Sequence, residues 1–286
     1  MKKLSVVLAT RNEEANIGEC LEAVKGLADD IVVVDEGSED RTREIAEGYG
    51  ARVFKVTHEA IFHKTKQKAL DLAQGDWVLQ LDADERVTAE LAKEVKEVTQ
   101  KELPGEIQDS KKKALFKRHQ AILEARDGKI GTDNGPYVAF FVPRRNIFLG
   151  KPLIHAGVYP DASIRLIRKG KAHFPAKSVH EIMEVDGRVG WLQNDLEHYD
   201  SPTFFRYLVR ANRYTDLTAK EFEKNKVPIN CFALFHYSFI KPTLVFLKLY
   251  IRHLGLLDGM RGLIWSLFSA LHFPIAYFKY WQKASK

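Results

Sequence analysis

Two carboxylates, Asp82 and Asp84, stand one residue apart directly after an apolar run at residues 77–81. An apolar run that ends abruptly in acids is typical of a buried strand, at whose carboxyl end open α/β sheets bind their ligands. Because alternate residues of an extended chain point to the same side, we expect the two carboxylates to share a face. Such a pair repels unless a cation lies between its members, and a divalent ion bridging phosphates fits that position. The alternative is a solvated turn in which Asp84 lies near the start of a helix at 88–97.

The first hundred residues alternate between predicted strands and helices. We expect strands at 4–9, 31–35, 52–56 and 77–81, and helices at 13–24, 42–49, 64–73 and 88–97. This order predicts a parallel sheet with right-handed crossovers. Three of the strands end in polar clusters, at residues 10–13, 35–38 and 82–84, which must emerge at one edge of such a sheet. Each cluster could cap a helix, but the shared edge favours a pocket.

Length and cysteine content indicate a compact intracellular enzyme. A chain of 286 residues can hold one large domain or a core domain with an appendage. Cys20 and Cys231 are far apart, so we expect neither a disulfide framework nor a cysteine metal site. The first three residues are basic, but the apolar run behind them ends at Thr10. We therefore predict no signal peptide and a cytoplasmic location.

The last 86 residues are basic, apolar and aromatic. Residues 201–286 carry thirteen Lys and Arg but four acids, and residues 262–278 have no formal charge. A helix of that length spans about 26 Å, short of the ~30 Å hydrocarbon core, and we expect Pro274 to interrupt it. Apolar bodies flanked by Lys and Arg favour helices that lie in a membrane interface and are drawn to anionic lipid. The alternatives are a helical hairpin packed on the catalytic domain and a homodimer interface.

The sequence divides into an α/β domain at about 1–200 and C-terminal helices at 201–286. Within the first we distinguish the half that carries the three polar clusters, 1–100, from a second half at about 136–200. Between them lies a charged stretch at 101–135. We favour a solvated helix face for this stretch over a surface that binds phosphate or lipid.

Three motifs resemble the signature of family-2 glycosyltransferases with the GT-A fold. They are S-V-V-L-A-T-R-N-E-E at 5–14, V-V-V-D-E-G-S-E-D-R-T at 32–42 and L-D-A-D-E at 81–85. Further motifs are similar to those of bacterial lipopolysaccharide core glucosyltransferases: R-R-N-I-F-L-G-K at 144–151, Y-P-D-A-S-I-R-L-I at 159–167, V-H-E at 179–181, H-Y-D at 198–200 and L-D-G-M-R-G-L at 257–263. The stretch at 101–135 has no counterpart in that pattern. The resemblance implies a GT-A fold, Rossmann-like, with a mostly parallel sheet flanked by helices and a membrane-associating helical extension.

The resemblance also implies that residues 1–100 form the nucleotide-sugar half and residues at about 136–200 the acceptor half, and it implies how a nucleotide sugar is held. Asp84 would be the direct ligand of Mg²⁺ or Mn²⁺, with Asp82 nearer the ribose or sharing the metal. The nucleotide-binding positions of the family fall here on Ala9, Arg11, Glu13, Asp35, Lys66, Asp82 and Ala83. Asp35 can accept from a uracil imide N–H, which favours UDP, although it could instead simply cap the following helix. Lys64 and Lys68 flank Lys66, and helical spacing lets only one of the three face the site.

The catalytic base is assigned by the same resemblance. Glu181 is the first candidate for the general base, with His180 orienting it or approaching the metal. Asp161 competes for this role, or grips acceptor hydroxyls together with Arg165. His198 is a candidate for the leaving-group or metal side. A direct displacement with one base inverts the anomeric centre, and no residue suggests itself as a nucleophile for a double displacement.

The expected function is inverting, metal-dependent transfer of a hexose, with glucose favoured, from a UDP-sugar to a membrane-borne glycan such as lipopolysaccharide core. The protein would work at the cytoplasmic face of the inner membrane. A nucleotidyltransferase is the first alternative, but it would show a Gly-rich basic loop after the first strand, where residues 10–14 are acidic and lack glycine. The second, a non-enzymatic basic membrane-binding module, leaves the carboxylates unexplained. We expect no nucleic-acid partner, because the aromatic residues of the tail lie within aliphatic runs.

Overall fold

The computed structural model describes residues 3–175 and 182–284. They form two compact units. Unit 1 comprises the described residues up to 145 together with those from 160 to 198, and unit 2 comprises residues 146–159 and those from 199 onward. Unit 1 gives way to unit 2 between residues 198 and 199, and the boundary expected from the sequence was near residue 200. The segment 146–159, which we expected in the α/β domain, belongs instead to unit 2.

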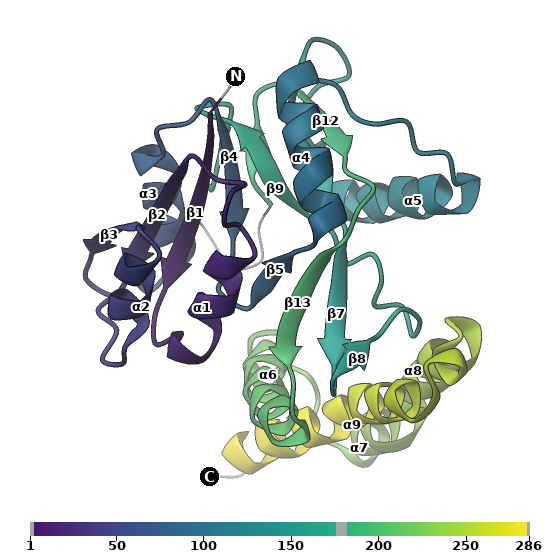
Figure 1. The fold of residues 1–286 in the computed structure, drawn as a ribbon. Coiled ribbons are helices and arrows are strands. Elements are labelled where there is room, and N and C mark those ends of the chain that lie inside the picture. Colours follow the sequence, from purple (N-terminus) through teal and green to yellow (C-terminus); the bar gives the residue numbers. More distant parts are fainter. Residues whose placement is uncertain (1–2, 176–181, 285–286) are drawn as a thin grey trace. The chain divides into compact units, whose positions relative to one another are not determined.

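A seven-stranded sheet forms the centre of unit 1, with the order β12-β6-β9-β4-β1-β2-β3 (Figure 1). Its strands are β1 (Leu4–Thr10), β2 (Asp30–Asp35), β3 (Arg52–Lys55), β4 (Trp77–Leu81), β6 (Tyr137–Val142), β9 (Ser163–Arg168) and β12 (Arg188–Trp191). Neighbouring strands are parallel except where β9 pairs antiparallel with β4 and β6. The predicted α/β fold with a mostly parallel sheet is therefore confirmed.

Helices cover both faces of this sheet (Figure 1). On one face lie α1 (Glu14–Glu22), α2 (Thr42–Gly48) and α4 (Ala89–Lys101), and on the other α3 (His63–Leu72) and α5 (Ser110–Asp127). The larger core fills the first face: Ile17 and Leu21 of α1 and Leu91 of α4 pack with Val6 of β1 and Leu79 of β4. The four helices predicted in the first hundred residues all form, with ends shifted by a few residues.

Helix α5 accounts for much of the charged stretch at 101–135. Its one buried side chain, Phe116, stacks on Trp191 with ring centroids 4.3 Å apart. The indole N–H of Trp191 donates to Gln120 Oε1 at 3.0 Å. Lys113 and Lys117 are exposed, as expected for a solvated helix face.

Short strands complete the fold. They are β5 (Glu85–Val87), β7 (Arg144–Phe148), β8 (Lys151–Pro152), β10 (Ala172–His173), β11 (Glu184–Val185) and β13 (Leu196–Ser201). In unit 1, β5 pairs antiparallel with the first residues of β13, and β10 pairs with β11. In unit 2, the end of β7 pairs with β8.

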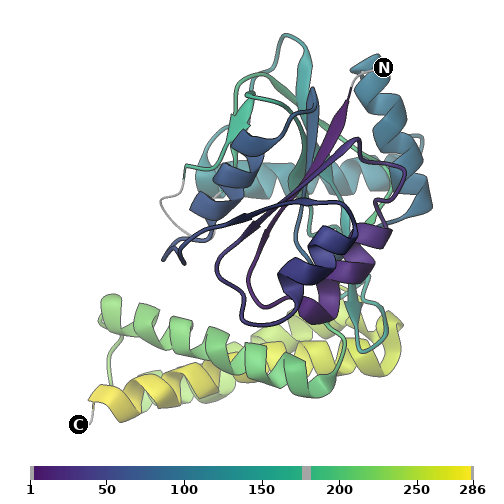
Figure 2. The same ribbon diagram turned by 60° about the vertical axis from the view of Figure 1, so that its left-hand side comes forward.

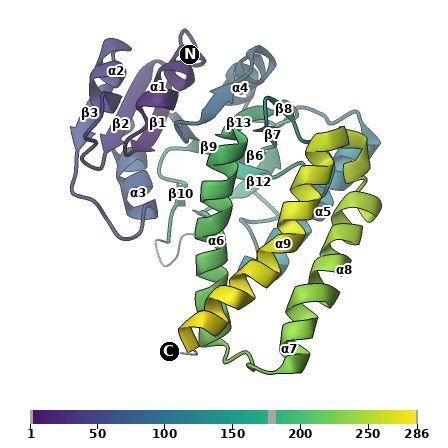
Figure 3. The ribbon, with the colours of Figure 1, turned by 90° about the horizontal axis from the view of Figure 1, so that it is seen from below.

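Unit 2 is built mainly of helices. They are α6 (Phe204–Lys224), α7 (Cys231–Phe235), η1 (His236–Ile240), α8 (Lys241–Leu247), η2 (Lys248–Arg252), η3 (Gly255–Asp258) and α9 (Gly259–Ala284). Helix α9 packs between α6 and α8 (Figure 3), and Figure 2 shows α6 and α9 side by side. Leu153 is buried in this unit against Phe148 and Tyr207. That packing explains why the segment 146–159 joins the helices.

The expected interruption at Pro274 is wrong, because α9 continues through it to Ala284. Proline removes one backbone donor and usually breaks a helix. Here the residue is buried in a helix that packs on two others, and this packing offsets the lost hydrogen bond. Among the described residues, no single helix has the length and apolar composition of a membrane span; the bent pair Cys231–Arg252 and Gly255–Ala284, with 71° between its halves, meets both criteria when taken together.

Candidate active site

Three parallel strands end at one edge of the sheet, as predicted. β1 runs parallel to both β2 and β4, so the polar residues that follow them emerge together. The loops after β1 and β2 are bonded to each other: the Asn12 N–H donates to Ser38 Oγ and the Glu13 N–H to Thr42 Oγ1, both at 2.8 Å. The Glu39 N–H in turn donates to Asn12 Oδ1 at 2.9 Å. The loops after β1 and β2 therefore form one connected surface rather than two separate helix caps.

The nucleotide candidates at this edge differ in accessibility. Ala9 and Asp35 are buried, Glu13 is half-buried and Arg11 is exposed. The carboxylate of Asp35 accepts the N–H of Ser38 at 2.8 Å and also the hydroxyl of that residue. In this structure Asp35 therefore stabilises the turn at Ser38, whereas α2 begins at Thr42 without a side-chain cap, so the capping alternative is not met. Its contact with a nucleotide stays a prediction.

The D-A-D-E segment is a tight turn. β4 ends at Leu81 and β5 begins at Glu85, so Asp82 and Asp84 do not lie along one extended strand. The argument from strand alternation for a shared face therefore does not apply. The two carboxylates contact different partners, and these differences set their chemistry.

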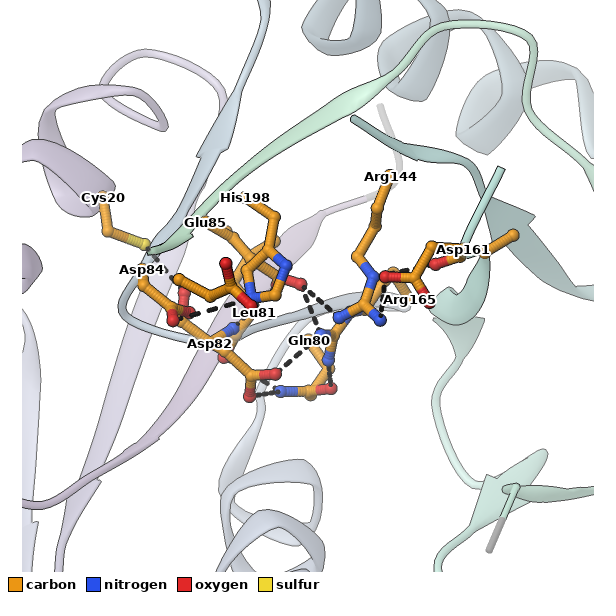
Figure 4. A network of polar contacts seen from close by, with 12 residues as sticks. Cys20, Gln80, Leu81, Asp82, Asp84, Glu85, Arg144, Asp161, Arg165 and His198 are labelled. Carbon is orange, nitrogen blue, oxygen red and sulfur yellow. Dashed lines mark hydrogen bonds and ion pairs between the residues drawn. The ribbon is translucent and has the colours of Figure 1, made fainter. Parts of the chain in front are cut away.

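Asp82 is neutralised by two cations. Its Oδ1 lies 2.5 Å from Lys66 Nζ, and its Oδ2 accepts from Arg165 Nη2 at 2.7 Å (Figure 4). Burial acts to raise the pKa of Asp82, but the charges of Arg165 and Lys66 outweigh it and hold that pKa well below its usual range. Asp82 is therefore ionised and paired, which makes it a poorer metal ligand than its neighbour.

Asp84 has a different partner, His198. The Nε2 atom of His198 lies 3.6 Å from Asp84 Oδ2, and the Asp84 side chain is 20% exposed. Burial acts to raise the pKa of Asp84, but the hydrogen bond and charge of His198 lower it overall. No Lys or Arg is paired with this carboxylate in the part of the chain that the structure describes. Asp84 therefore keeps the negative charge that a metal ligand needs.

Glu85 connects the turn to two arginines. Its side chain is 0% exposed, and its Oε2 accepts the N–H of Asp82 at 2.9 Å. Its Oε1 accepts from Arg165 Nη2 at 2.5 Å and from Arg144 Nη1 at 3.4 Å (Figure 4). Charge-assisted hydrogen bonds to a buried carboxylate are among the stronger ones in proteins. Glu85 thus holds the turn and the arginines together.

Asp161 is held by Arg144 rather than by Arg165. Arg144 Nη2 donates to Asp161 Oδ2 at 2.9 Å. Arg165 is buried against Gln80, Asp82 and Glu85, so the expected joint grip of Asp161 and Arg165 on an acceptor is wrong. The side chain of Asp161 is 40% exposed and can be reached by a substrate.

Of the three lysines of α3, only Lys66 faces the site, as helical spacing predicted. Lys64 and Lys68 are exposed, and Lys64 pairs with Glu59 at 3.3 Å. His180 and Glu181 lie outside the described residues. The chain that leads to them is anchored on α3, because the Phe174 N–H donates to Gln67 Oε1 at 2.8 Å.

The residues at this edge fit a divalent metal in a limited way. Among residues 3–175 and 182–284, no group of three or more His, Cys, Asp and Glu side chains could hold a metal ion by itself. Asp84 and His198 supply one carboxylate and one imidazole, so most ligands would have to be phosphate oxygens and water. Mg²⁺ and Mn²⁺ are commonly bound in this way, through few side chains and substrate phosphates.

Sequence reasoning missed two members of the network, Glu85 and Arg144. Glu85 stood in the quoted L-D-A-D-E motif and Arg144 opened the quoted R-R-N motif, so both were visible without a role. A buried ion pair between distant motifs leaves no local pattern. Glu85 begins β5 and Arg144 begins β7, and only the folded chain brings the starts of these two strands together.

Comparisons with known proteins identify the kind of protein that carries this site. Residues 5–146 match the family model described as Glycosyl transferase family 2. The chain is similar to the lipopolysaccharide core biosynthesis glycosyltransferase LpsC of Rhizobium meliloti, with 26% identity over 281 residues, 93% of this chain and 90% of that protein.

Two further matches cover about a third of the proteins concerned. An uncharacterized glycosyltransferase of Rickettsia typhi is 40% identical over 95 residues, 33% of this chain and 32% of that protein. The crystal structure of glucosyl-3-phosphoglycerate synthase from Mycobacterium tuberculosis in complex with Mn²⁺, UDP and glucosyl-3-phosphoglycerate matches 29% of this chain and 34% of that one, with 30% identity and a TM-score of 0.27.

Proposed function

We propose that this chain, which belongs to glycosyltransferase family 2, transfers a hexose from a UDP-sugar to a membrane-borne glycan such as lipopolysaccharide core. It is a glycosyltransferase that resembles lipopolysaccharide core enzymes. The observation that carries the finer proposal is the pair of Asp84 and His198 at the carboxyl edge, beside an Asp82 already neutralised by Lys66 and Arg165. Glucose is the favoured hexose.

Asp84 and His198 would hold Mg²⁺ or Mn²⁺ together with the diphosphate of the donor. When bound, such an ion supplies Lewis-acid neutralisation of the diphosphate leaving group. Lys66 adds a cation on the same side, because its ammonium already lies at Asp82 and could turn to a phosphate oxygen. Asp82 would then contact the ribose rather than share the metal.

The nucleotide would lie along the ends of β1 and β2. The exposed guanidinium of Arg11 offers a plane on which uracil can stack. The backbones of Ala9 and Ala83 would line the site, with Glu13 and Asp35 accepting from the base and ribose. For Asp35 this requires exchanging its bond with the Ser38 hydroxyl for one with uracil.

Two carboxylates compete to deprotonate the acceptor hydroxyl. Glu181, with His180 beside it in the sequence, remains the first candidate, and Asp161 is the second. The base takes the proton of the acceptor hydroxyl as its oxygen attacks the anomeric carbon. The bond from that carbon to the diphosphate breaks and UDP leaves, so this single displacement inverts the anomeric centre. A general base contributes about 10²–10⁴ in rate.

The membrane part of the proposal rests on unit 2. From α7 through η3, large apolar side chains are exposed: Phe232, Leu234, Phe235, Phe239, Ile240, Leu244, Leu247, Ile251, Leu254, Leu256 and Leu257. Lys248 and Arg252 are exposed in the same segment. Such a surface costs free energy in water and suits an interface of anionic lipid. We therefore propose a location at the cytoplasmic face of the inner membrane, close to a lipid-linked acceptor. A homodimer that covers the same surface is the alternative outcome.

Purified protein incubated with a panel of nucleotide sugars, with and without Mg²⁺ or Mn²⁺, tests the donor and the metal. Transfer to extracted lipopolysaccharide core, with NMR of the new glycosidic bond, tests the acceptor and the inversion. Metal-dependent turnover of a UDP-hexose and an inverted product are expected. Retention of configuration, or turnover of another nucleotide sugar alone, would contradict the proposal.

A further inference from the structure

We infer that Arg144 is a positioning residue that holds Asp161 in place to bind the acceptor hydroxyl, and that Glu85 in turn holds Arg144. The inference rests on the proposed function and adds to it an acceptor-binding carboxylate with the group that orients it. It draws on contacts within unit 1 alone, which Figure 4 shows from close by.

Arg144 makes three hydrogen bonds to two consecutive residues. Its backbone N–H donates to the carbonyl of Pro160 at 2.8 Å. Its Nε donates to the carbonyl of Asp161, and its Nη2 to the Asp161 carboxylate, both at 2.9 Å. A planar guanidinium that binds backbone and side chain of one residue fixes both their position and their orientation.

The backbone of Asp161 needs this support. Its φ of 38° lies in the left-handed region, which non-glycine residues seldom adopt. Strained backbone of this kind persists only where the surroundings determine it, and it is often found at functional sites. The hydrogen bond from Arg144 Nε to the carbonyl of this same residue stabilises the conformation. The turn therefore presents a carboxylate that is 40% exposed in a defined direction.

Glu85 gives Arg144 its own fixed position. The carboxylate of Glu85 is fully buried and lies between the guanidinium groups of Arg144 and Arg165. Without that charge the two cations would repel each other. Its Oε2 accepts the N–H of Asp82, so Glu85 also belongs to the D-A-D-E turn.

The contacts therefore form one chain from the donor side to the acceptor side. Asp82 bonds to Arg165, Arg165 to Glu85, Glu85 to Arg144, and Arg144 to Asp161. Buried ion networks of this kind act together, because each member loses its compensation when a neighbour is removed. A small misplacement of the acceptor hydroxyl can lower the rate of transfer about 10²-fold. A mobile Asp161 would lose that orientation even though its charge is unchanged.

Arg144→Lys tests the inference in the full-length protein, because it keeps the charge but removes the planar set of donors. We expect kcat for transfer to the acceptor to fall about 10–10²-fold, with UDP affinity within about twofold of wild type. Asp161→Asn should lower transfer by a similar factor. If Arg144 acts through Asp161, the double variant should be no worse than Asp161→Asn alone.

Arg145→Lys is the matched control. Arg145 is the next residue of the same motif, but it lies 3.8 Å from Asp195 and 3.9 Å from Glu197 rather than at the turn. We expect normal transfer from this variant. Thermal unfolding of all variants separates positioning from folding. The lower kcat of Arg144→Lys must be observed at a temperature well below the melting temperature of that variant.

Different results contradict different statements. If Arg144→Lys transfers normally, or if its effect multiplies with that of Asp161→Asn, Arg144 does not position Asp161. A loss of thermal stability with normal turnover would make the network a structural one. A wild-type protein that turns over no UDP-sugar contradicts the proposed function itself, and the inference with it.

Discussion

His198 Nε2 lies 3.6 Å from Asp84 Oδ2, although the two residues belong to the two different chain segments that make up unit 1. The antiparallel pairing of β13 with β5 brings them together, because His198 is the register partner of Glu85. The backbone hydrogen bonds between β13 and β5 therefore hold the imidazole of His198 beside the D-A-D-E turn. This pairing places one carboxylate and one imidazole next to each other at the edge of the sheet.

Asp84→Ala should abolish transfer and leave the fold intact, because the side chain lies at the sheet edge and is partly exposed. Binding of Mn²⁺ in the presence of UDP, measured by calorimetry, should be lost together with activity. Asp71→Ala, an exposed acid on α3, is the control and should behave as wild type. Activity that persists in EDTA, or in Asp84→Ala, would rule out the metal role.

The Arg165 contacts predict an effect on stability with a definite pH dependence. Arg165→Leu leaves the buried Glu85 with Arg144, at 3.4 Å, as its remaining cationic partner, and we expect a loss of about 3 kcal/mol in the free energy of unfolding at neutral pH. Because the pKa of Asp82 is depressed in the folded protein, its contribution is complete above the ordinary value of 3.8 and is lost as the pH falls below that value. The difference between wild type and variant should therefore shrink below pH 3.8.

Urea unfolding at several pH values measures this difference. Arg168→Leu is the control, because Arg168 lies on the same strand and pairs at the surface with Glu102 at 3.2 Å. A surface pair of this kind is worth about 0–1 kcal/mol. Equal losses for both variants would mean that the buried network adds nothing special.

Asp35→Asn should weaken UDP binding by about 1–3 kcal/mol, the cost of a buried group that loses its partner. Calorimetry with UDP measures the affinity. Because Asp35 also accepts from the Ser38 hydroxyl, Ser38→Ala, which removes that hydroxyl and keeps the carboxylate, serves as a control for the turn itself. Unchanged UDP affinity in Asp35→Asn, with lowered thermal stability, would limit this residue to stabilising the turn at Ser38.

The elements of the first hundred residues were predictable because their signals are local. An apolar run such as that of β4 ends in charge, and the helices between the strands show their own periodicity. The edge location of the acids follows from the parallel order alone. Helical spacing predicted that only one of Lys64, Lys66 and Lys68 faces the site, and the family resemblance singled out Lys66.

The partners of the acids were not predictable, because they depend on pairing between distant strands. Arg165 and Asp161 are close in sequence, yet β9 runs antiparallel beside β4 and directs Arg165 to Gln80 and Asp82. A single sequence carries no signal for that register. The prediction that Pro274 interrupts the last helix failed for a related reason, since packing between helices outweighed a local preference.

Glu181→Gln should lower kcat by about 10²–10⁴ and spare donor binding if Glu181 is the general base. The substitution keeps the size of the side chain and removes its basicity. Steady-state kinetics with saturating donor measures the effect, and UDP affinity is the internal control. Normal turnover in Glu181→Gln combined with failure of Asp161→Asn would transfer the role to Asp161.

The apolar surface of unit 2 should bind vesicles that contain anionic lipid. Flotation of the full-length protein should be strong with anionic vesicles, weaker with neutral ones, and partly reversed by high salt, since each basic residue near such a surface contributes about 1 kcal/mol. Phe232 and Phe239 are among the most exposed aromatic side chains, at 75% and 61%. Replacing both with Ser should lower vesicle binding at least about tenfold, because each buried ring contributes about 1.5–3 kcal/mol.

Leu103→Ser is the matched control, because Leu103 is an exposed apolar residue of unit 1. It should float as wild type does. The Phe232/Phe239 double variant should keep UDP affinity but transfer poorly to a lipid-borne acceptor. A wild-type protein that ignores anionic vesicles and elutes as a stable dimer would assign this surface to subunit contact. Resistance to both salt and alkaline carbonate would instead mean that the bent pair of helices enters the hydrocarbon core, where neither treatment releases a protein.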